Sequence, residues 1–482
     1  MTARFIAYGG AGTVTGANFL LDTGNNPSTS FDKAQGKSLG ARKILIDCGT
    51  IEREYASDTV NSAPFAYDPS GIDELIVTHA HADHIGRIPK LVRDGFHGVI
   101  HSTAPTKDLA EIMFEDALNI MHEDAKRRGG VVLYEKSDVE RALSLWKTHE
   151  YHEVFGLGDL TIELLDAGDI LGSAMVRVTR LRQGSGGQER SILFTGDLGN
   201  SPEPLLNDAE SPEGVSYLVM ESVYGDRVHA DRERRQKILR DMVLDARNRS
   251  SVLLIPSFSI ERTQILLFEL NNMVEQGTLD MIRVYLDAPL AIRTTAVYRK
   301  YQHLLNPAVR EHFAKGDDPF NFKNLQLTWH SEESDAIHTA PNPKVIIAGA
   351  GMAAGGRIRA HLKRYASDPN AVILFVGYQV PGSLGRRIED GAKKVQIDGE
   401  YVKIRAHIVS ITGYSGHKDR DALLDFVESS GESLPAGRHG LEKVFVTMGE
   451  PKASMFLAQR IGDFLGVEAL VPEVGQSFEL SF

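Results

Sequence analysis

The sequence Thr78-His79-Ala80-His81-Ala82-Asp83-His84 decides the fold, because it places four side chains of metal-ligand type close together. It overlaps a short apolar segment, Glu74–Thr78, that predicts a buried strand. Alternate side chains at a strand end point the same way, so His79 and His81 can hold one ion. The apolar residues that follow recur at helical spacing, namely Ile85, Ile88, Leu91 and Val92. A helix that begins at this motif turns Asp83 and His84 toward a neighbouring position.

The ligand types in this motif indicate its chemistry. Imidazole and carboxylate together suit zinc, iron or manganese. Two such ions, held roughly 3.5–4 Å apart, would clamp and activate a water for in-line attack on a phosphodiester. The alternative is a solvated polar loop, but so many ligand-type residues between a buried strand and a helix make that interpretation poor. We therefore predict a hydrolase with two divalent metal ions.

The length and composition describe a globular chain with more than one core. Its 482 residues exceed the usual ~100–200 residues of one domain, so two large units are expected. The net charge of −12 excludes a generally basic surface and confines any nucleic-acid contact to a local groove. The single cysteine, Cys48, excludes a disulfide framework. No apolar run of ~18 residues predicts a membrane span, and no apolar signal core follows Met1, so we expect a cytoplasmic protein.

Hydrophobic periodicity divides the chain into three parts. Strand-like segments dominate up to about residue 212, apart from a helical stretch near 105–150. Beyond that point strands alternate with amphipathic helices, as in the strand Val252–Ile255 and the helix Arg262–Glu275, which indicates a parallel sheet. Near Tyr401 the strand-rich pattern returns. We therefore predict a first domain formed by residues 1–212 and 398–482, interrupted by an inserted α/β domain of residues 213–397.

Three residues far from the first motif are candidates to complete a metal site. Asp197 ends the strand-like segment Leu193–Asp197, Glu221 follows the segment Tyr217–Met220, and His417 follows a glycine-containing turn. Each of these residues alone has an ordinary interpretation as a turn, cap or structural residue. Their significance depends on the first motif.

Several motifs, in order along the chain, resemble the β-CASP branch of metallo-β-lactamase proteins. They are Thr78–His84 with Gly86, Thr195–Asp197, Glu221–Arg227, Ile255–Gln264, Gly355–Ile358 and Ser415–His417. The chain looks most like the bacterial and archaeal relatives of the endonuclease subunit of the eukaryotic pre-mRNA 3′-end cleavage complex. The resemblance covers nearly the whole chain. It implies an αββα metallo-β-lactamase sandwich with an inserted α/β β-CASP domain, and a cleft between the two for single-stranded RNA.

The resemblance also implies a set of metal ligands. His79 and His81 would hold one ion, Asp83 and His84 would hold the other, and Asp197 would bridge the two. A histidine at the last motif would complete the second site. Asp169 stands at the position of a further ligand in relatives. The predicted metal ligands are therefore His79, His81, Asp83, His84, Asp169, Asp197 and His417.

The catalytic residues implied by the resemblance are Asp83, Glu221 and His417. Glu221 would be the β-CASP acid near the scissile phosphate. In this family a histidine at the last motif marks the RNA-cleaving branch, whereas the DNA-repair branch carries valine. His417 therefore favours RNA as the substrate.

Three positions depart from the family pattern. Asp169 stands where relatives carry a histidine ligand; as a harder ligand it should shift the first site from zinc toward manganese or iron. Arg387 stands near the position of a β-CASP histidine; it cannot donate a proton at neutral pH but can bind phosphate bidentately. Met448 replaces the histidine of a His-Gly-Glu motif. These departures motivate a second hypothesis, a non-catalytic RNA-binding subunit.

A basic cluster in the inserted part supports contact with RNA. Four cationic residues lie on one predicted helix that follows a glycine turn, namely Arg357, Arg359, Lys363 and Arg364. The alternative is a solvated helix face. His361 in the same helix could equally be a structural histidine, so it is not among the predicted catalytic residues. The predicted substrate-binding residues are Arg357, Ser383, Arg386 and Arg387.

The sequence therefore favours a metal-dependent ribonuclease that acts on single-stranded RNA, as an endonuclease, a 5′-exonuclease or both. Zinc is the expected metal, with manganese or iron as the alternatives because of Asp169. Hydrolysis of small molecules such as thioesters or lactams is a third hypothesis, against which the long basic insertion argues. We expect no membrane partner. A homodimer is compatible with the sequence.

Overall fold

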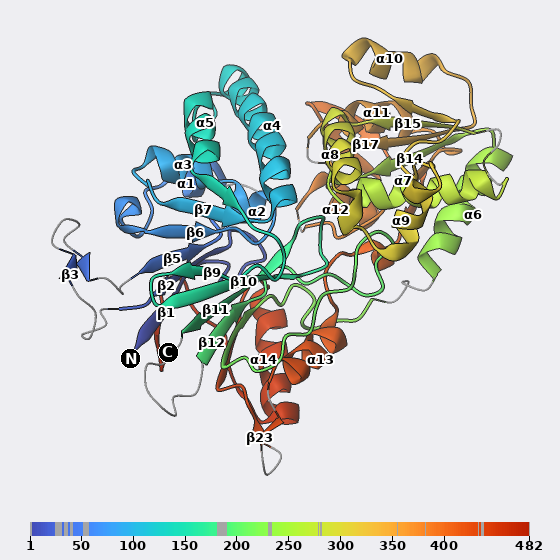
Figure 1. Cartoon of the computed structure of the whole chain (residues 1–482). Helices are drawn as coiled ribbons and strands as arrows, with labels where there is room; N and C mark the ends of the chain where they lie inside the picture. The colour runs from blue at the N-terminus through green and yellow to red at the C-terminus, as the bar shows by residue number, and fades with distance from the viewer. Residues whose placement is uncertain are drawn as a thin grey trace. The chain divides into compact units, whose positions relative to one another are not determined.

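The chain folds into two compact units. The computed structural model describes residues 2–24, 31–32, 37–38, 42–51, 57–180, 190–229, 234–277, 279, 282–353, 355–380, 382–431, 433–434 and 438–481. The first unit comprises Met1–Glu203, Asn207–Val228 and Gly416–Phe482, and the second comprises Pro204–Leu206 and His229–Ser415 (Figure 1).

The first unit contains two seven-stranded sheets. Sheet one has the order β26-β1-β2-β5-β6-β7-β8 and sheet two the order β25-β24-β13-β12-β11-β10-β9. The strands of sheet one are β1 (Ala3–Gly9), β2 (Asn18–Asp22), β5 (Lys43–Ile46), β6 (Glu74–Ile76), β7 (Val99–Ser102), β8 (Trp146–Thr148) and β26 (Ser477–Leu480). Those of sheet two are β9 (Phe155–Leu157), β10 (Leu160–Asp166), β11 (Ala174–Arg180), β12 (Arg190–Phe194), β13 (Tyr217–Met220), β24 (Lys443–Val446) and β25 (Glu468–Leu470). Short strand pairs add β3 (Phe31–Asp32) with β4 (Lys37–Ser38), and β22 (Ser433–Leu434) with β23 (Arg438–His439).

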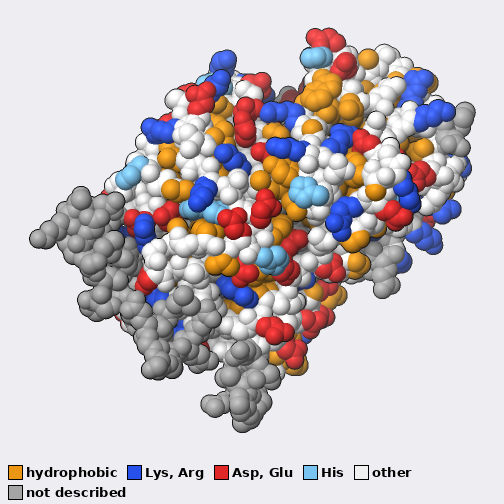
Figure 2. Space-filling view, in the orientation of Figure 1, with side chains coloured by type: hydrophobic (Ala, Val, Ile, Leu, Met, Phe, Trp, Pro, Cys, Tyr) orange, Lys and Arg blue, Asp and Glu red, His pale blue; other side chains and the backbone are white. Residues whose placement is uncertain are grey.

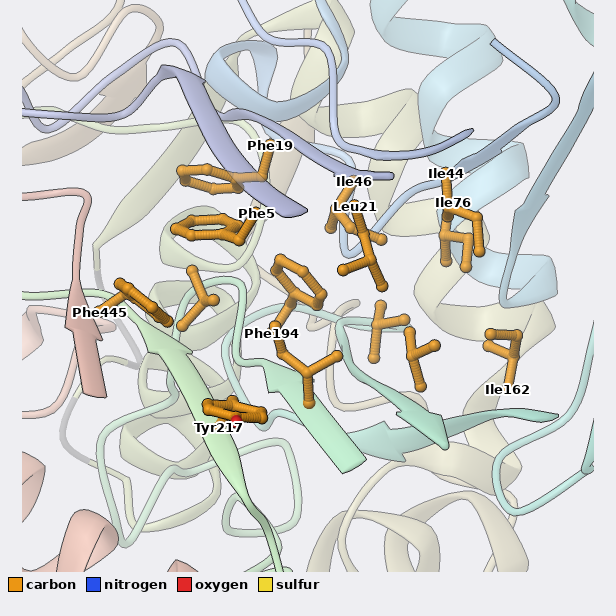
Figure 3. Close-up of a cluster of buried hydrophobic side chains, with 14 of the residues drawn as sticks. Phe5, Phe19, Leu21, Ile44, Ile46, Ile76, Ile162, Phe194, Tyr217 and Phe445 are labelled. Carbon is orange, nitrogen blue, oxygen red and sulfur yellow. The ribbon is translucent and has the colours of Figure 1, made fainter. Parts of the chain in front are cut away.

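The two sheets pack face to face around an apolar core. Strand β1 alternates buried and more exposed side chains, which directs Phe5 inward. Phe5 lies among aromatic residues of both sheets, and its ring centroid is 4.8 Å from that of Phe445 (Figure 3). Phe19 of sheet one and Phe194 of sheet two belong to the same cluster (Figure 3). Burial of these rings removes a large apolar area from water and holds the sheets together.

Helices cover the outer faces of the sandwich (Figure 1). On the side of sheet one lie α1 (Ser57–Ser62), α2 (Ala82–Ile85), α3 (Ile88–Arg93), α4 (Ala104–Arg128) and α5 (Lys136–Ser144). Sheet two is covered by α13 (Arg420–Ser430) and α14 (Pro451–Leu465), whose Phe426 and Leu457 pack against Leu218. The predicted αββα sandwich is thus confirmed. The helix expected after the His79–His84 motif is two short helices, because Pro89 at the start of α3 favours a new helix start.

The second unit is built on a six-stranded sheet of order β16-β15-β17-β14-β18-β21, in which every neighbouring pair is parallel. Its strands are β14 (Val252–Pro256), β15 (Arg283–Asp287), β16 (Leu325–Leu327), β17 (Lys344–Ala348), β18 (Val372–Phe375) and β21 (His407–Ser410). Its helices are α6 (Arg235–Asn248), α7 (Arg262–Glu275), α8 (Pro289–Lys300), α9 (Pro307–Ala314), α10 (Ser331–Thr339), α11 (Ile358–Tyr365) and α12 (Leu384–Glu389). A hairpin, β19 (Lys394–Ile397) and β20 (Glu400–Lys403), completes it. The predicted α/β insertion with a parallel sheet is confirmed.

The boundaries between the two compact units differ from the predicted domain boundaries. Strand β13 pairs with β12 and β24, so residues 217–220 belong to the sandwich. Strand β21 pairs with β18, so residues 407–410 belong to the second unit. The boundaries 1–212, 213–397 and 398–482 stay a prediction of domains. Among the described residues, no helix has the length and apolar character that a membrane span requires.

Candidate metal centre

The first motif lies where sheet one ends and two loops of sheet two come close. His81 is the N-cap residue of α2, so the chain is extended at His79–His81 and helical at Asp83 and His84, as predicted. Close approach requires glycine at two positions of the adjoining loops. Gly196 has φ +56°, and a Cβ on Gly199 would lie 1.8 Å from the Gly168 carbonyl oxygen.

One group of ligand atoms comes from His79, His81, Asp169 and Asp197. The donor atoms of these four residues all lie within 4.8 Å of one another. His79 Nε2 is 3.7 Å from Asp169 Oδ2 and 3.5 Å from Asp197 Oδ2. His81 Nδ1 is 3.6 Å from Asp169 Oδ2. These separations are short enough for the four side chains to share one ion, and the role of Asp169 as a ligand stays a prediction.

A second group adjoins the first through Asp197. His84 Nε2 is 3.7 Å from Asp83 Oδ2 and 3.4 Å from Asp197 Oδ1. Asp197 therefore presents Oδ2 to His79 and Oδ1 to His84. A carboxylate with one oxygen toward each ligand group is suited to bridge two ions.

His417 lies at the edge of this arrangement and is paired with Glu221. Its Nδ1 is 3.1 Å from Glu221 Oε1 and 3.9 Å from Asp197 Oδ2. A β-bridge between Gly199 and His417 holds the segment beside the Asp197 loop. The side chain of Glu221 is fully buried, burial raises its pKa, and its Oε1 also accepts a 2.7 Å hydrogen bond from the amide of Leu198. Glu221 thus reaches His417 and not solvent.

The electrostatics of the cluster fit a cation. Burial alone would lower the pKa of His84, but the carboxylates of Asp197 and Asp83 raise it well above its usual value. Burial would raise the pKa of Asp197, but His84 and His417 hold it well below. Burial lowers the pKa of His79. His84 Nε2 and Asp197 Oδ1 are buried and, among the described residues, neither atom has a hydrogen-bond partner. A divalent ion would satisfy both atoms, and the nitrogen and oxygen donors suit zinc, manganese or iron.

A residue that we did not predict, Asp47, orients the second ligand group. Its Oδ2 lies 2.7 Å from His84 Nδ1, and its Oδ1 accepts a 2.8 Å hydrogen bond from the amide of Thr78. Asp47 is buried and has φ 59°, a conformation that Asp adopts more readily than most residues. The available signal was a carboxylate directly after the apolar segment Lys43–Ile46.

Known domain families match three parts of the chain. The metallo-β-lactamase superfamily matches residues 13–118, the Beta-Casp domain matches residues 263–388, and the Zn-dependent metallo-hydrolase RNA specificity domain matches residues 401–472. Ribonuclease TTHA0252 of Thermus thermophilus is 35% identical over 447 residues, which cover 93% of this chain and 95% of that protein. The chain belongs to the β-CASP family of metallo-β-lactamase proteins.

Further relatives are consistent with this β-CASP assignment. The transcription termination factor FttA of Methanosarcina mazei is 30% identical over 480 residues, which cover 96% of this chain and 70% of that protein. A crystal structure of a protein of unknown function from Enterococcus faecalis V583 matches with a TM-score of 0.55 at 12% identity, covers all of both chains, and supports the fold alone.

Two of the three departures from the β-CASP pattern have a clear place in the structure. Asp169 is buried within the first ligand group, and its amide donates a 3.0 Å hydrogen bond to Ser173 Oγ. Met448 is buried in the core between the sheets, where its sulfur faces Gly10. Its position is therefore a packing position in this chain.

The second unit contains the Beta-Casp match and is the β-CASP unit of the chain. The predicted substrate-binding residues in it mostly have partners within the same unit. Arg357 donates to Asp287 Oδ1 at 2.7 Å and to the Trp329 carbonyl at 2.8 Å. Arg386 Nε pairs with Asp390 at 2.9 Å, and Ser383 caps α12 by accepting from the Arg386 amide. Arg387 is exposed, and no ion pair within the described ranges involves it. Of the four side chains, that of Arg387 is the most exposed to solvent.

Asp287 explains why Arg357, at the start of the predicted basic helix, is not a free cation. Besides Arg357, it accepts hydrogen bonds from Thr328 and Ser334, and its Oδ2 is 2.7 Å from His361 Nε2. Burial would raise the pKa of Asp287, but these hydrogen bonds hold it well below its usual value. His361 is fully buried, as expected of a structural histidine.

Proposed function

We propose that this chain hydrolyses phosphodiester bonds of single-stranded RNA with two divalent metal ions. Membership in the β-CASP family makes it a metal-dependent hydrolase. The similarity to a protein named ribonuclease and to proteins named transcription termination factor points to RNA as the substrate. The number of ions, the single-stranded substrate and the residue roles are our proposal.

The observation that carries the proposal is the position of Asp197 between two ligand groups. Its two carboxylate oxygens face His79 and His84 at 3.5 and 3.4 Å. We assign one ion to His79, His81, Asp169 and Asp197, and the other to Asp83, His84, Asp197 and His417. Bound ions would supply Lewis-acid stabilisation of the phosphate and a more acidic water.

The chain's own residues would position the substrate and handle protons. The side chains of Asp83 and His417 are 22% and 24% exposed, so both face the open side of the site, where the Asp83 carboxylate could accept a proton from an attacking water. Glu221 is buried behind His417, and we assign it to orienting that imidazole through the 3.1 Å contact with Nδ1. Asp83 and His417 then line the site beside the bound RNA, and Glu221 acts through His417.

RNA would bind through a few local contacts, because the surface as a whole carries no excess of positive charge. The net charge is −12, and acidic and basic side chains are mixed over the face drawn in Figure 2. Arg387 is an exposed cation in the β-CASP unit, suited to a phosphate. The non-catalytic hypothesis gains no support from the geometry, because every predicted metal ligand lies beside another one.

The test is cleavage of end-labelled RNA by metal-free protein to which zinc or manganese is returned. Single-stranded RNA, duplex RNA and single-stranded DNA of the same sequence are compared, with 5′ and 3′ labels to distinguish internal from terminal cutting. We expect metal-dependent cleavage of single-stranded RNA and much slower cleavage of the other two. Tight RNA binding without cleavage under any metal would support the non-catalytic hypothesis instead.

A further inference from the structure

The hairpin β19–β20 of the β-CASP unit has one buried and one exposed face. Val395, Ile397 and Val402 point into the core of the unit. The opposite face carries Lys394 and Gln396 on β19 and Tyr401 and Lys403 on β20, all of them exposed. In the antiparallel register Lys394 lies opposite Lys403, and Gln396 lies opposite Tyr401. The exposed face is thus two adjoining cross-strand pairs, which we call the hairpin face.

The two lysines of the hairpin face lie opposite each other without a compensating acid. Side chains in such a pair have Cβ atoms about 5 Å apart, and like charges there are destabilising. Across the described part of the chain, neither Lys394 nor Lys403 is in a salt bridge with a carboxylate. The nearest acids in sequence are already engaged, because Asp398 pairs with Arg359 and Glu400 pairs with Lys363. The hairpin face therefore presents positive charge on an acidic protein.

Tyr401 adds an aromatic surface to this charge. It is 69% exposed, and Lys394 Nζ lies 4.1 Å from the centroid of its ring. An exposed ring beside cations is the combination by which proteins hold single-stranded nucleic acid, with bases stacked on the ring and phosphates paired to the cations. A protein partner would favour a larger apolar area than one tyrosine.

We propose that the hairpin face is a contact surface for single-stranded RNA, with a base stacked on Tyr401 and phosphates paired to Lys394 and Lys403. The inference rests on the proposed RNA substrate and adds a surface that none of the predicted substrate-binding residues belongs to. The stacking contact is tolerant of sequence because every base has a π-face. The hairpin face would therefore bind unpaired RNA of any base sequence.

The variant Lys403→Glu separates binding from stability. It places opposite charges across the Lys394 pair, so the hairpin should be at least as stable as in the wild type. RNA binding should nevertheless weaken several-fold, and the slope of log affinity against log salt should decrease by about 0.7, the value for one phosphate contact with a single strand. The matched control is Lys323→Glu, which makes the same charge change at an exposed lysine just before β16, at the opposite edge of the sheet from β21.

The measurement is fluorescence anisotropy of labelled single-stranded RNA with chelator-treated protein, so that binding is read without cleavage. Tyr401→Ala should bind about tenfold more weakly and Tyr401→Phe close to wild type, because stacking needs the ring and not the hydroxyl. Photo-crosslinking with 5-iodouridine RNA should label Tyr401. If the wild type does not bind RNA at all, the proposed function fails. If it binds, but Lys403→Glu and Tyr401→Ala match the Lys323→Glu control and Tyr401 is not crosslinked, this inference alone is overturned.

Discussion

Asp47 Oδ2 lies 2.7 Å from Nδ1 of His84, on the side of the imidazole away from Asp197. A carboxylate at this distance accepts a hydrogen bond from Nδ1–H, which keeps the proton on Nδ1 and leaves the lone pair of Nε2 for a metal ion. Nε2 is the atom that faces Asp197 Oδ1 at 3.4 Å. Asp47 therefore selects the tautomer in which His84 can bind a metal ion.

The variant Asp47→Asn should bind the second metal ion more weakly while the fold is kept. Asn tolerates the left-handed backbone at this position and can still accept the hydrogen bond from Thr78. Its amide group would donate to His84 Nδ1, so Nε2 would carry the proton and could not act as a ligand. We expect metal affinity to fall by about 10–100-fold at one site, measured by titration calorimetry with zinc and manganese.

Asp47→Glu provides the comparison, because it keeps the carboxylate and should retain more of the affinity than Asp47→Asn. Equal metal content in wild type and Asp47→Asn would show that His84 does not need this partner.

Removal of a ligand from the first motif should remove at least one metal ion and abolish cleavage. His81→Ala or Asp83→Ala removes a donor from one ligand group, and each protein should lose at least one metal equivalent and all RNA cleavage. Elemental analysis and a cleavage assay measure the two effects, and circular dichroism checks the fold. His97→Ala, at an exposed histidine outside the ligand groups, is the control. Full activity in both ligand variants would refute the site.

Exchange of Asp169 for histidine should change the metal preference. Asp169 Oδ2 is 3.7 Å from His79 Nε2 and 3.6 Å from His81 Nδ1, so it supplies a hard, negative oxygen to the first group. Asp169→His should raise zinc affinity and move the activity optimum from manganese toward zinc. Asp169→Ala should deplete one ion far more than the other. Identical metal content and preference in all three proteins would exclude Asp169 as a ligand.

The two neighbouring arginines of α12 should differ in their effect on RNA binding. Arg387 is exposed without an ion pair among the described residues, whereas Arg386 already pairs with Asp390. Arg387→Ala should weaken binding several-fold and lower the salt slope by about 0.7, the value for one phosphate contact with a single strand. Arg386→Ala should have a smaller effect on both. Anisotropy titrations at three salt concentrations compare the two variants, and a larger effect of Arg386→Ala would contradict the assignment.

A partly buried carboxyl near the metal centre should make stability depend on pH. Burial raises the pKa of Asp166 to about 6, above its ordinary value of 3.8. Its protonated form therefore stabilises the fold below pH 3.8, and this contribution is lost as pH rises through about 6. Asp166→Asn can keep the hydrogen bond from the Gly168 amide without the charge. Relative to wild type it should gain stability between pH 4 and 6, up to about 3 kcal/mol for a pKa raised from 3.8 to about 6, and hold that gain above.

The measurement is chemical denaturation of metal-free wild type and Asp166→Asn at several pH values. Only the difference between the two proteins is used, so that other titrating groups cancel. A difference that does not change between pH 4 and 7 would contradict the raised pKa.

Much of the fold could be predicted from local patterns. Period-two alternation and helical spacing depend on near neighbours, so the helix Arg262–Glu275 and the strand that begins at Val252 were found at their observed positions. The limits of the compact units could not be read in the same way. Strands β13 and β21 are apolar segments that could join either unit, and only their pairing partners decide which.

By itself the sequence determined the first motif, because His79, His81, Asp83 and His84 are close along the chain and a strand-to-helix turn brings their side chains together. The tertiary structure alone decided what surrounds them. Asp47 meets His84, and Glu221 meets His417, from positions far apart in the chain. The tertiary structure also pairs Arg357, a predicted phosphate ligand, with the buried carboxylate of Asp287. Periodicity records which face of an element is apolar, but contacts between distant polar side chains depend on how the sheets and loops pack, which no local pattern encodes.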